Sequence, residues 1–228
     1  MESKEVIMIY DSFENLDDVK KQAIINAGFK SFGENGYKKT SVEQIVKEAG
    51  ISKGSLFYYF QSKKNFYMYL FDYCASQMER RIDVPGEDGI PTYMQKTDFF
   101  ERLREIQLLK AKFSKDYPHV YSFMKSVIFE ASPVVHGEIQ NISNNIIKER
   151  TMEFYYNLDT YKFKDGIDPK MVLQLLTWCS EGCANQLLIK QKRRSSHNQT
   201  EDDFKEIIGV YNTYVELLRT NFYKEEYL

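Results

Sequence analysis

The spacing of apolar residues predicts helices along nearly the whole chain. From residue 17 onward, apolar positions recur every three or four residues, which is the period of a helix with one buried face. No segment shows the alternation of apolar and polar residues that is typical of a β-strand. We therefore predict an all-α protein of about nine helices. The expected helices cover residues 17–35, 41–49, 53–60, 63–82, 97–114, 118–130, 134–158, 169–192 and 201–218.

Residues 36–66 contain two short predicted helices with a tight turn between them. Thr40 is the expected N-cap of the first helix, and Glu43, three residues later, completes a capping box. Gly50 ends that helix, because the residue after a helix often needs a positive φ. Ser52 then caps the second helix almost at once.

The second short helix has two unlike faces. Its expected inner face carries Leu56 and Phe60. Its expected outer face carries Lys53, Ser55, Tyr58 and Tyr59. Two helices joined by so short a turn, the second bearing polar and aromatic side chains, predict a helix-turn-helix. An ordinary pair of core helices is the competing interpretation.

The same stretch resembles the N-terminal DNA-binding domain of the tetracycline-repressor (TetR, or AcrR-like) family of bacterial transcription regulators. The segments that carry the resemblance are Phe32–Tyr37, Thr40–Ile45, Ala49–Phe60 and Ser62–Phe66. The chain departs from the family pattern at Val46, Phe57 and Phe66, where Ala, Tyr and Leu are usual. The resemblance implies a three-helix DNA-binding domain, a helix that links it to the rest, and a helical C-terminal domain for ligand binding and dimerisation.

A loop rich in Pro and Gly marks the expected boundary between these domains. Residues 83–91 contain two Pro and two Gly, which disfavour a continued helix. We therefore expect the DNA-binding domain over residues 17–82 and the regulatory and dimerisation domain over residues 83–228. Residues 1–16 form an N-terminal extension that is polar at both ends, and we expect a loosely docked tail there.

Charge and composition agree with this organisation. The whole chain has a formal net charge of -2, but residues 17–82 hold 11 Lys and Arg against seven Asp and Glu. A basic segment within an otherwise acidic chain is typical of a DNA-binding domain. Three cysteines, an odd number, indicate no disulfide framework. No apolar run approaches the roughly 20 residues of a membrane span, so we expect a cytoplasmic protein that does not bind membranes.

The second short helix is the expected DNA-reading element. A recognition helix contacts bases through side chains near its N-terminus, and helix N-termini also bind phosphate. We predict DNA contacts at Thr40, Ser52, Lys53, Gly54, Ser55, Phe57, Tyr58, Tyr59 and Lys63. Gly54 permits close approach of the backbone. By the family pattern, Phe57 lacks a hydroxyl that meets phosphate. A solvated surface side chain is the competing interpretation for each residue.

A single helix-turn-helix reads only a few base pairs, so useful specificity requires a homodimer on a palindromic site. The resemblance implies that the last two helices form the dimer interface. The expected interface residues are Leu175, Leu176, Ala184, Leu187, Ile208, Tyr211, Val215 and Leu218. An intramolecular core is the competing role for these side chains.

The resemblance further implies that a small molecule binds inside the C-terminal domain and releases the protein from its operator. Aromatic candidates for the pocket wall are Phe100, Phe123, Phe129, Tyr155 and Trp178. Aromatic residues at helical spacing are also common in plain cores. We therefore predict a repressor with an unknown effector. The alternative is a DNA-bound scaffold, associated with the nucleoid or with division, that has the same fold and no small-molecule switch.

The sequence offers no positive sign of catalysis. It contains no Gly-rich phosphate loop and no nucleophile elbow, and its three His are scattered. Cys179 and Cys183 share a helix face, but no His lies near them in the sequence to complete a metal site. Buried small side chains are the favoured interpretation of this pair. We therefore expect no enzyme activity, no cofactor and no metal.

Overall fold

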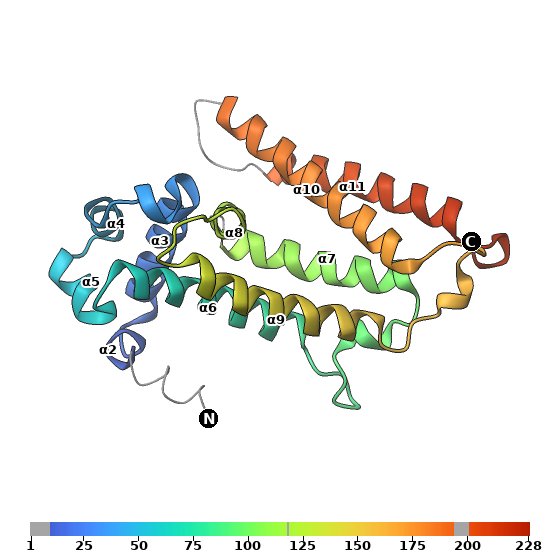
Figure 1. Cartoon of the computed structure of the whole chain (residues 1–228), viewed down its shortest axis with the longest axis horizontal. Coiled ribbons are helices and arrows are strands. Elements are labelled where there is room, and N and C mark those ends of the chain that lie inside the picture. Colours follow the sequence, from blue (N-terminus) through green and yellow to red (C-terminus); the bar gives the residue numbers. More distant parts are fainter. Residues whose placement is uncertain (1–9, 118, 194–200) are drawn as a thin grey trace. The chain divides into compact units, whose positions relative to one another are not determined.

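The computed structural model describes residues 10–117, 119–193 and 201–228. Within these ranges the chain is α-helical, with three short 3₁₀ helices and two isolated β-bridges but no strand. The helices are α2 (Asp11–Glu14), α3 (Asp18–Lys39), α4 (Val42–Ala49), α5 (Lys53–Phe60), α6 (Lys63–Ile82), α7 (Phe99–Asp116), α8 (Val120–Ile128), α9 (His136–Tyr155), α10 (Pro169–Arg193) and α11 (Glu201–Phe222) (Figure 1). The predicted all-α class is confirmed.

The nine predicted helices correspond to α3 through α11, and among the α-helices of the described residues α2 alone was not expected. The predicted cap at Ser52 is confirmed, because its side chain accepts a hydrogen bond from a backbone amide of α5. Ser62 caps α6 in the same way. Gly50 ends α4 in the left-handed conformation, with φ of 66°. The predicted cap at Thr40 is wrong, because α4 is capped by Ser41, whose side chain accepts from the Gln44 amide.

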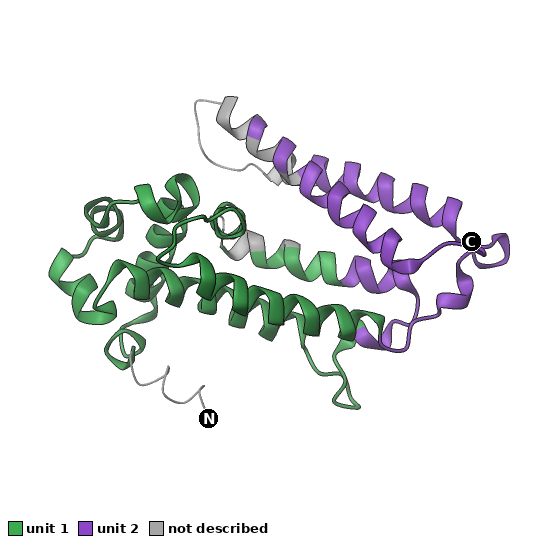
Figure 2. Ribbon diagram, viewed as in Figure 1, with its two compact units in different colours: residues 1–93, 106–155 green, residues 94–105, 156–228 purple. Residues whose placement is uncertain are grey.

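The chain divides by packing into two compact units (Figure 2). Unit 1 comprises residues 1–93 and 106–155, and unit 2 comprises residues 94–105 and 156–228. A compact unit is defined by packing, whereas the expected domains are defined by function. The functional boundary near residue 83 therefore stays a prediction.

Unit 1 has an aromatic core. The Phe123 ring of α8 lies 5.0 Å from the Phe29 ring of α3 and 5.4 Å from the Tyr67 ring of α6. Phe32 packs edge-on against Tyr67, with 4.9 Å between centroids. Such offset and edge-to-face pairs add stability beyond the apolar area that they bury. This core holds α3, α6 and α8 together, and α4 packs against α3 while α5 packs against α6.

Unit 2 is built around a buried arginine. The Arg102 side chain is fully buried, and its guanidinium donates hydrogen bonds to the carbonyl oxygens of Lys96 at 2.7 Å, Tyr156 at 2.6 Å and Met94 at 2.7 Å. A planar guanidinium can hold several backbone acceptors at once. Arg102 thus joins two distant segments of the chain within this unit.

None of the helices in the described ranges has an apolar stretch long enough to cross a lipid bilayer.

Candidate nucleic-acid interface

Helices α4 and α5 form the predicted helix-turn-helix. Ile45 of α4 and Leu56 and Phe60 of α5 are buried in the core of unit 1. Three residues separate the helices: Gly50 in the left-handed conformation, then Ile51 and the cap Ser52. Apolar burial therefore fixes one side of each short helix and leaves the other side to solvent.

Residues 36–41, between the kink in α3 and the start of α4, form a corner together with Lys63. This corner is held by hydrogen bonds to backbone groups. Gly36 interrupts α3 with φ of 69° and ψ of 175°. The Tyr37 amide after this kink donates to the Glu130 carboxylate at 2.7 Å. The Thr40 hydroxyl is buried and donates to the carbonyl oxygens of Gly36 at 2.6 Å and Ser31 at 3.0 Å. The Thr40 hydroxyl is thus turned into the protein, and the expected DNA contact of Thr40 stays a prediction.

Lys63, at the start of α6, belongs to the same corner. Its ammonium donates to the carbonyl oxygens of Tyr37 at 2.9 Å and Thr40 at 3.1 Å. It also lies 4.6 Å from the centroid of the Tyr37 ring, within the range of a cation–π interaction. Positive charge is favourable beside the carbonyl groups at the end of a helix. Lys63 therefore stabilises the end of α3, and its expected phosphate contact stays a prediction.

The exposed side of α5 carries most of the predicted DNA-reading residues. Ser52, Lys53 and Gly54 are exposed, Ser55 and Phe57 are half-buried, and Tyr58 is 71% exposed. Tyr59 is only 7% exposed, so its placement on the outer face was wrong. It follows Leu56 by three residues, which places it on the buried stripe of the helix.

An ion pair crosses the helix-turn-helix. The Lys53 ammonium of α5 lies 2.6 Å from the Glu43 carboxylate of α4. The hydrogen bond from Lys53 is the main reason that the pKa of Glu43 falls to about 2, and the backbone amide of Glu43 and the Ser41 hydroxyl also contribute. Both side chains are well exposed, so solvent screens the pair and it adds little stability. Besides this weak pair, the Lys53 ammonium lies 5.9 Å from the centroid of the Phe57 ring, and the DNA contact of Lys53 stays a prediction.

Known proteins match this region. Residues 24–68, from α3 into α6, match the family model described as "Bacterial regulatory proteins, tetR family". This span contains the whole of the helix-turn-helix and its supporting corner. This segment of the chain belongs to the TetR family.

Three known proteins are similar to longer parts of this chain than the family model covers. HTH-type transcriptional regulator RutR of Escherichia coli is 27% identical over 132 residues, which are 58% of this chain and 58% of RutR. The match therefore spans little more than half the length of that relative. IcaR of Staphylococcus aureus, the negative transcriptional regulator of the biofilm operon icaADBC, is 23% identical over 84% of this chain and 98% of IcaR. The crystal structure of FadR from Bacillus subtilis in complex with stearoyl-CoA has a TM-score of 0.60 at 18% identity, covering 86% of this chain and 96% of FadR.

The aromatic residues predicted to line a TetR-type ligand pocket have varied surroundings. In unit 1, Phe123 is core, Tyr155 is half-buried, and Phe129 is 76% exposed because it follows the last residue of α8. In unit 2, Phe100 is buried against Phe99, Phe163 and Tyr223. Trp178 is 57% exposed on α10. Phe100 and Phe123 therefore have the core role that was the competing interpretation.

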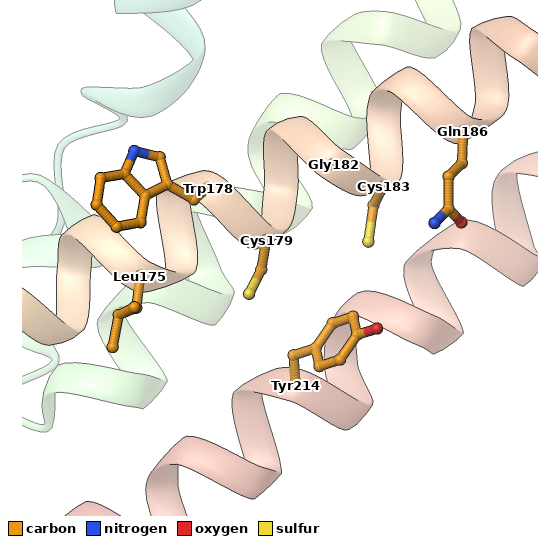
Figure 3. Close-up of a pocket in the computed structure, with 7 residues that line it drawn as sticks. All are labelled: Leu175, Trp178, Cys179, Gly182, Cys183, Gln186 and Tyr214. Carbon is orange, nitrogen blue, oxygen red and sulfur yellow. The ribbon is translucent and has the colours of Figure 1, made fainter.

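An open groove of about 290 Å³ lies between α10 and α11 (Figure 3). Its wall consists of Leu175, Trp178, Cys179, Gly182, Cys183, Gln186 and Tyr214. Cys183 is buried, as the sequence favoured for this pair, whereas Cys179 is only half-buried. Burial raises the pKa of the Cys183 thiol, which disfavours the reactive thiolate.

The predicted dimer residues divide between core and surface. Leu176, Tyr211 and Val215 are buried within the protomer, as the competing interpretation expected. Leu175, Ile208 and Leu218 are half-buried. The side chains of Ala184 and Leu187 lie outside the described part of the chain. The TetR-type role of α10 and α11 in dimerisation thus stays a prediction.

Sequence reasoning missed two features that support the helix-turn-helix, namely α2 and the Glu130 carboxylate. Tyr10, Phe13 and Leu16 are spaced by three residues, but α2 itself spans only Asp11–Glu14, which is too short for the spacing to predict a helix. Glu130 gave no signal either, because its partner amide lies 93 residues away in the sequence.

Proposed function

We propose that this protein is a sequence-specific DNA-binding transcription regulator. It acts as a homodimeric repressor that a small molecule releases from a palindromic operator. The observation that carries the proposal is the outer side of α5, where Lys53 and Tyr58 project from a short helix that the unit 1 core holds in place. Such a helix fits the major groove of DNA.

The exposed residues of α5 take separate roles in this proposal. The Ser52 and Ser55 side chains, whose oxygens are 2.8 Å apart at the start of α5, hydrogen bond to base edges or phosphates. Lys53 leaves Glu43 and binds a phosphate, and Tyr58 contacts a thymine methyl group or a phosphate. Thr40 and Tyr59 are buried; Thr40 stabilises the turn before α4, and Tyr59 anchors α5 to the core.

Dimerisation through α10 and α11 is the second part of the proposal. Met171, Trp178, Tyr214 and Leu217 are large apolar side chains on these helices that remain exposed in the protomer. A four-helix bundle of two helices from each protomer covers apolar surface of this kind. A dimer also supplies the second reading helix that a palindromic operator requires.

The proposals that this protein represses transcription and that a small molecule releases it from DNA are drawn from the similar proteins. IcaR is named a negative regulator, which favours repression here. The FadR structure contains stearoyl-CoA, which favours a small-molecule effector for a chain with the same fold. A ligand that binds one dimer geometry better than the other shifts the population away from the form that fits DNA. We further propose that the protein acts in the cytoplasm, where its operator lies.

The test is a fluorescence anisotropy titration of DNA from beside the protein's own gene, repeated at several salt concentrations. Lys53→Ala should weaken binding and reduce the slope of log K against log salt by about one, since one phosphate contact is lost. Lys170→Ala removes an exposed lysine from α10 and should leave both quantities unchanged. Equal effects of the two substitutions would contradict the assignment of Lys53.

A further inference from the structure

The chain segment before α3 is packed against the recognition helix. Phe13 of α2 is fully buried. Its ring centroid lies 4.7 Å from that of Phe60 and 5.8 Å from that of Tyr59, both in α5, and 5.2 Å from that of Tyr69 in α6. These contacts lie on the side of α5 that also carries the buried Leu56. The family match begins only at residue 24, so α2 lies outside it (Figure 1).

Polar contacts fasten α2 in the same place. The Tyr69 hydroxyl donates a hydrogen bond to the Glu14 carboxylate at 2.7 Å. The Lys21 ammonium of α3 donates to the Glu14 carbonyl oxygen at 3.1 Å. Tyr10 adds a ring contact to Phe60, with 5.5 Å between centroids. Residues 10–16 are therefore fixed to α3 and α6 as well as to α5, and the expected loosely docked tail is wrong for these residues.

A helix as short as α5 does not hold its own direction. It spans eight residues, and isolated helices of that length are unstable in water, so the packing of the buried side determines where the outer side points. Two of the three buried side chains of α5, Tyr59 and Phe60, touch Phe13. Removing the Phe13 ring leaves a void directly under the DNA-reading residues.

We propose that residues 10–16 are a positioning element for the recognition helix, with Phe13 as its positioning residue. They hold α5 from the side opposite its exposed face, so that Lys53 and Tyr58 meet DNA at a fixed angle. This assignment rests on the proposed DNA-binding function. It gives a specific task to a segment that precedes the family's DNA-binding domain.

Hydrogen–deuterium exchange on the full-length protein tests the positioning role without DNA. In Phe13→Ala, the amides of α5 should exchange about tenfold faster relative to those of α3 in the same chain, because local opening becomes easier. Phe13→Leu, which refills most of the void, should restore much of the protection. Phe113→Ala is the matched control, since Phe113 is also fully buried in unit 1 but its ring contacts are with Tyr117 and Arg81.

The same variants are then titrated with operator DNA at a temperature where each is folded. Phe13→Ala should bind about tenfold more weakly than wild type, Phe13→Leu should be intermediate, and Phe113→Ala should bind normally. Equal α5 exchange in wild type and Phe13→Ala, or equal acceleration in Phe113→Ala, overturns the positioning role. If wild type binds no specific DNA, the proposed function fails, and the exchange comparison still decides whether Phe13 holds α5.

Discussion

At the scale of single residues, a substitution of Gly54 tests DNA binding with little effect on the stability of the fold. A Cβ atom added there would meet only the Ser52 side-chain oxygen, at 3.7 Å, which is an ordinary contact. Gly54→Ala should therefore change the free energy of unfolding by less than about 1 kcal/mol. If the backbone approaches DNA closely, the added methyl group intrudes on the interface, and operator affinity should fall about tenfold.

Urea denaturation and DNA titration of the same Gly54→Ala preparation check both halves of this prediction. Wild-type affinity in the variant would show that the backbone of α5 does not approach DNA closely. A large loss of stability would instead indicate that Gly54 is required by the fold.

Local signals predicted some residues well and failed where tertiary contacts decide. Ser52, Ser62 and Gly50 were predictable as caps, since cap preference depends on a few neighbouring backbone groups. Thr40 and Ser41 can both cap a helix, and the choice depends on which hydroxyl is already engaged. The kink at Gly36 exposes carbonyl oxygens that take the Thr40 hydroxyl, so Ser41 becomes the cap.

At the scale of elements, the Glu130 side chain ties the end of α8 to the end of α3. Its carboxylate accepts hydrogen bonds from the backbone amides of Tyr37 at 2.7 Å and Ser132 at 2.9 Å. Glu130→Ala removes the acceptor of both amides, and a lost partner of this kind costs about 1–3 kcal/mol. Urea denaturation of the purified variant should show this loss.

Two further variants make the Glu130 measurement specific. Glu130→Gln keeps one carbonyl oxygen as an acceptor and should lose less stability than Glu130→Ala. Glu149→Ala removes an exposed carboxylate from α9 and should change stability by no more than about 0.5 kcal/mol. Equal losses in Glu130→Ala and Glu149→Ala would show that the link contributes nothing.

Helix positions were predictable to within a few residues because apolar periodicity and breakers are local features. The helix α2 was missed because four residues give too short a pattern, and its helical form depends on docking Phe13. The sequence alone also could not show which side chains pack against each buried helix face. Periodicity shows that Phe123 is buried, but only the fold shows that Phe29 and Tyr67 surround it.

At the scale of the whole molecule, the proposed function depends on two copies of the reading helix. In the proposed dimer, the large apolar side chains exposed on α10 and α11 form the surface for association. Recognition helices of a dimer read half-sites about one helical turn of DNA apart, roughly 34 Å. A protomer alone would bind with the low specificity of a single short helix.

The most direct test of the central claim combines a footprint with a mass measurement on the wild-type complex. DNA from beside the protein's own gene should show one protected palindromic site, occupied by two protomers in analytical ultracentrifugation. Binding should weaken steeply as salt rises, because phosphate contacts release counterions. Protection without sequence preference, or a complex that contains a single protomer, would contradict the account.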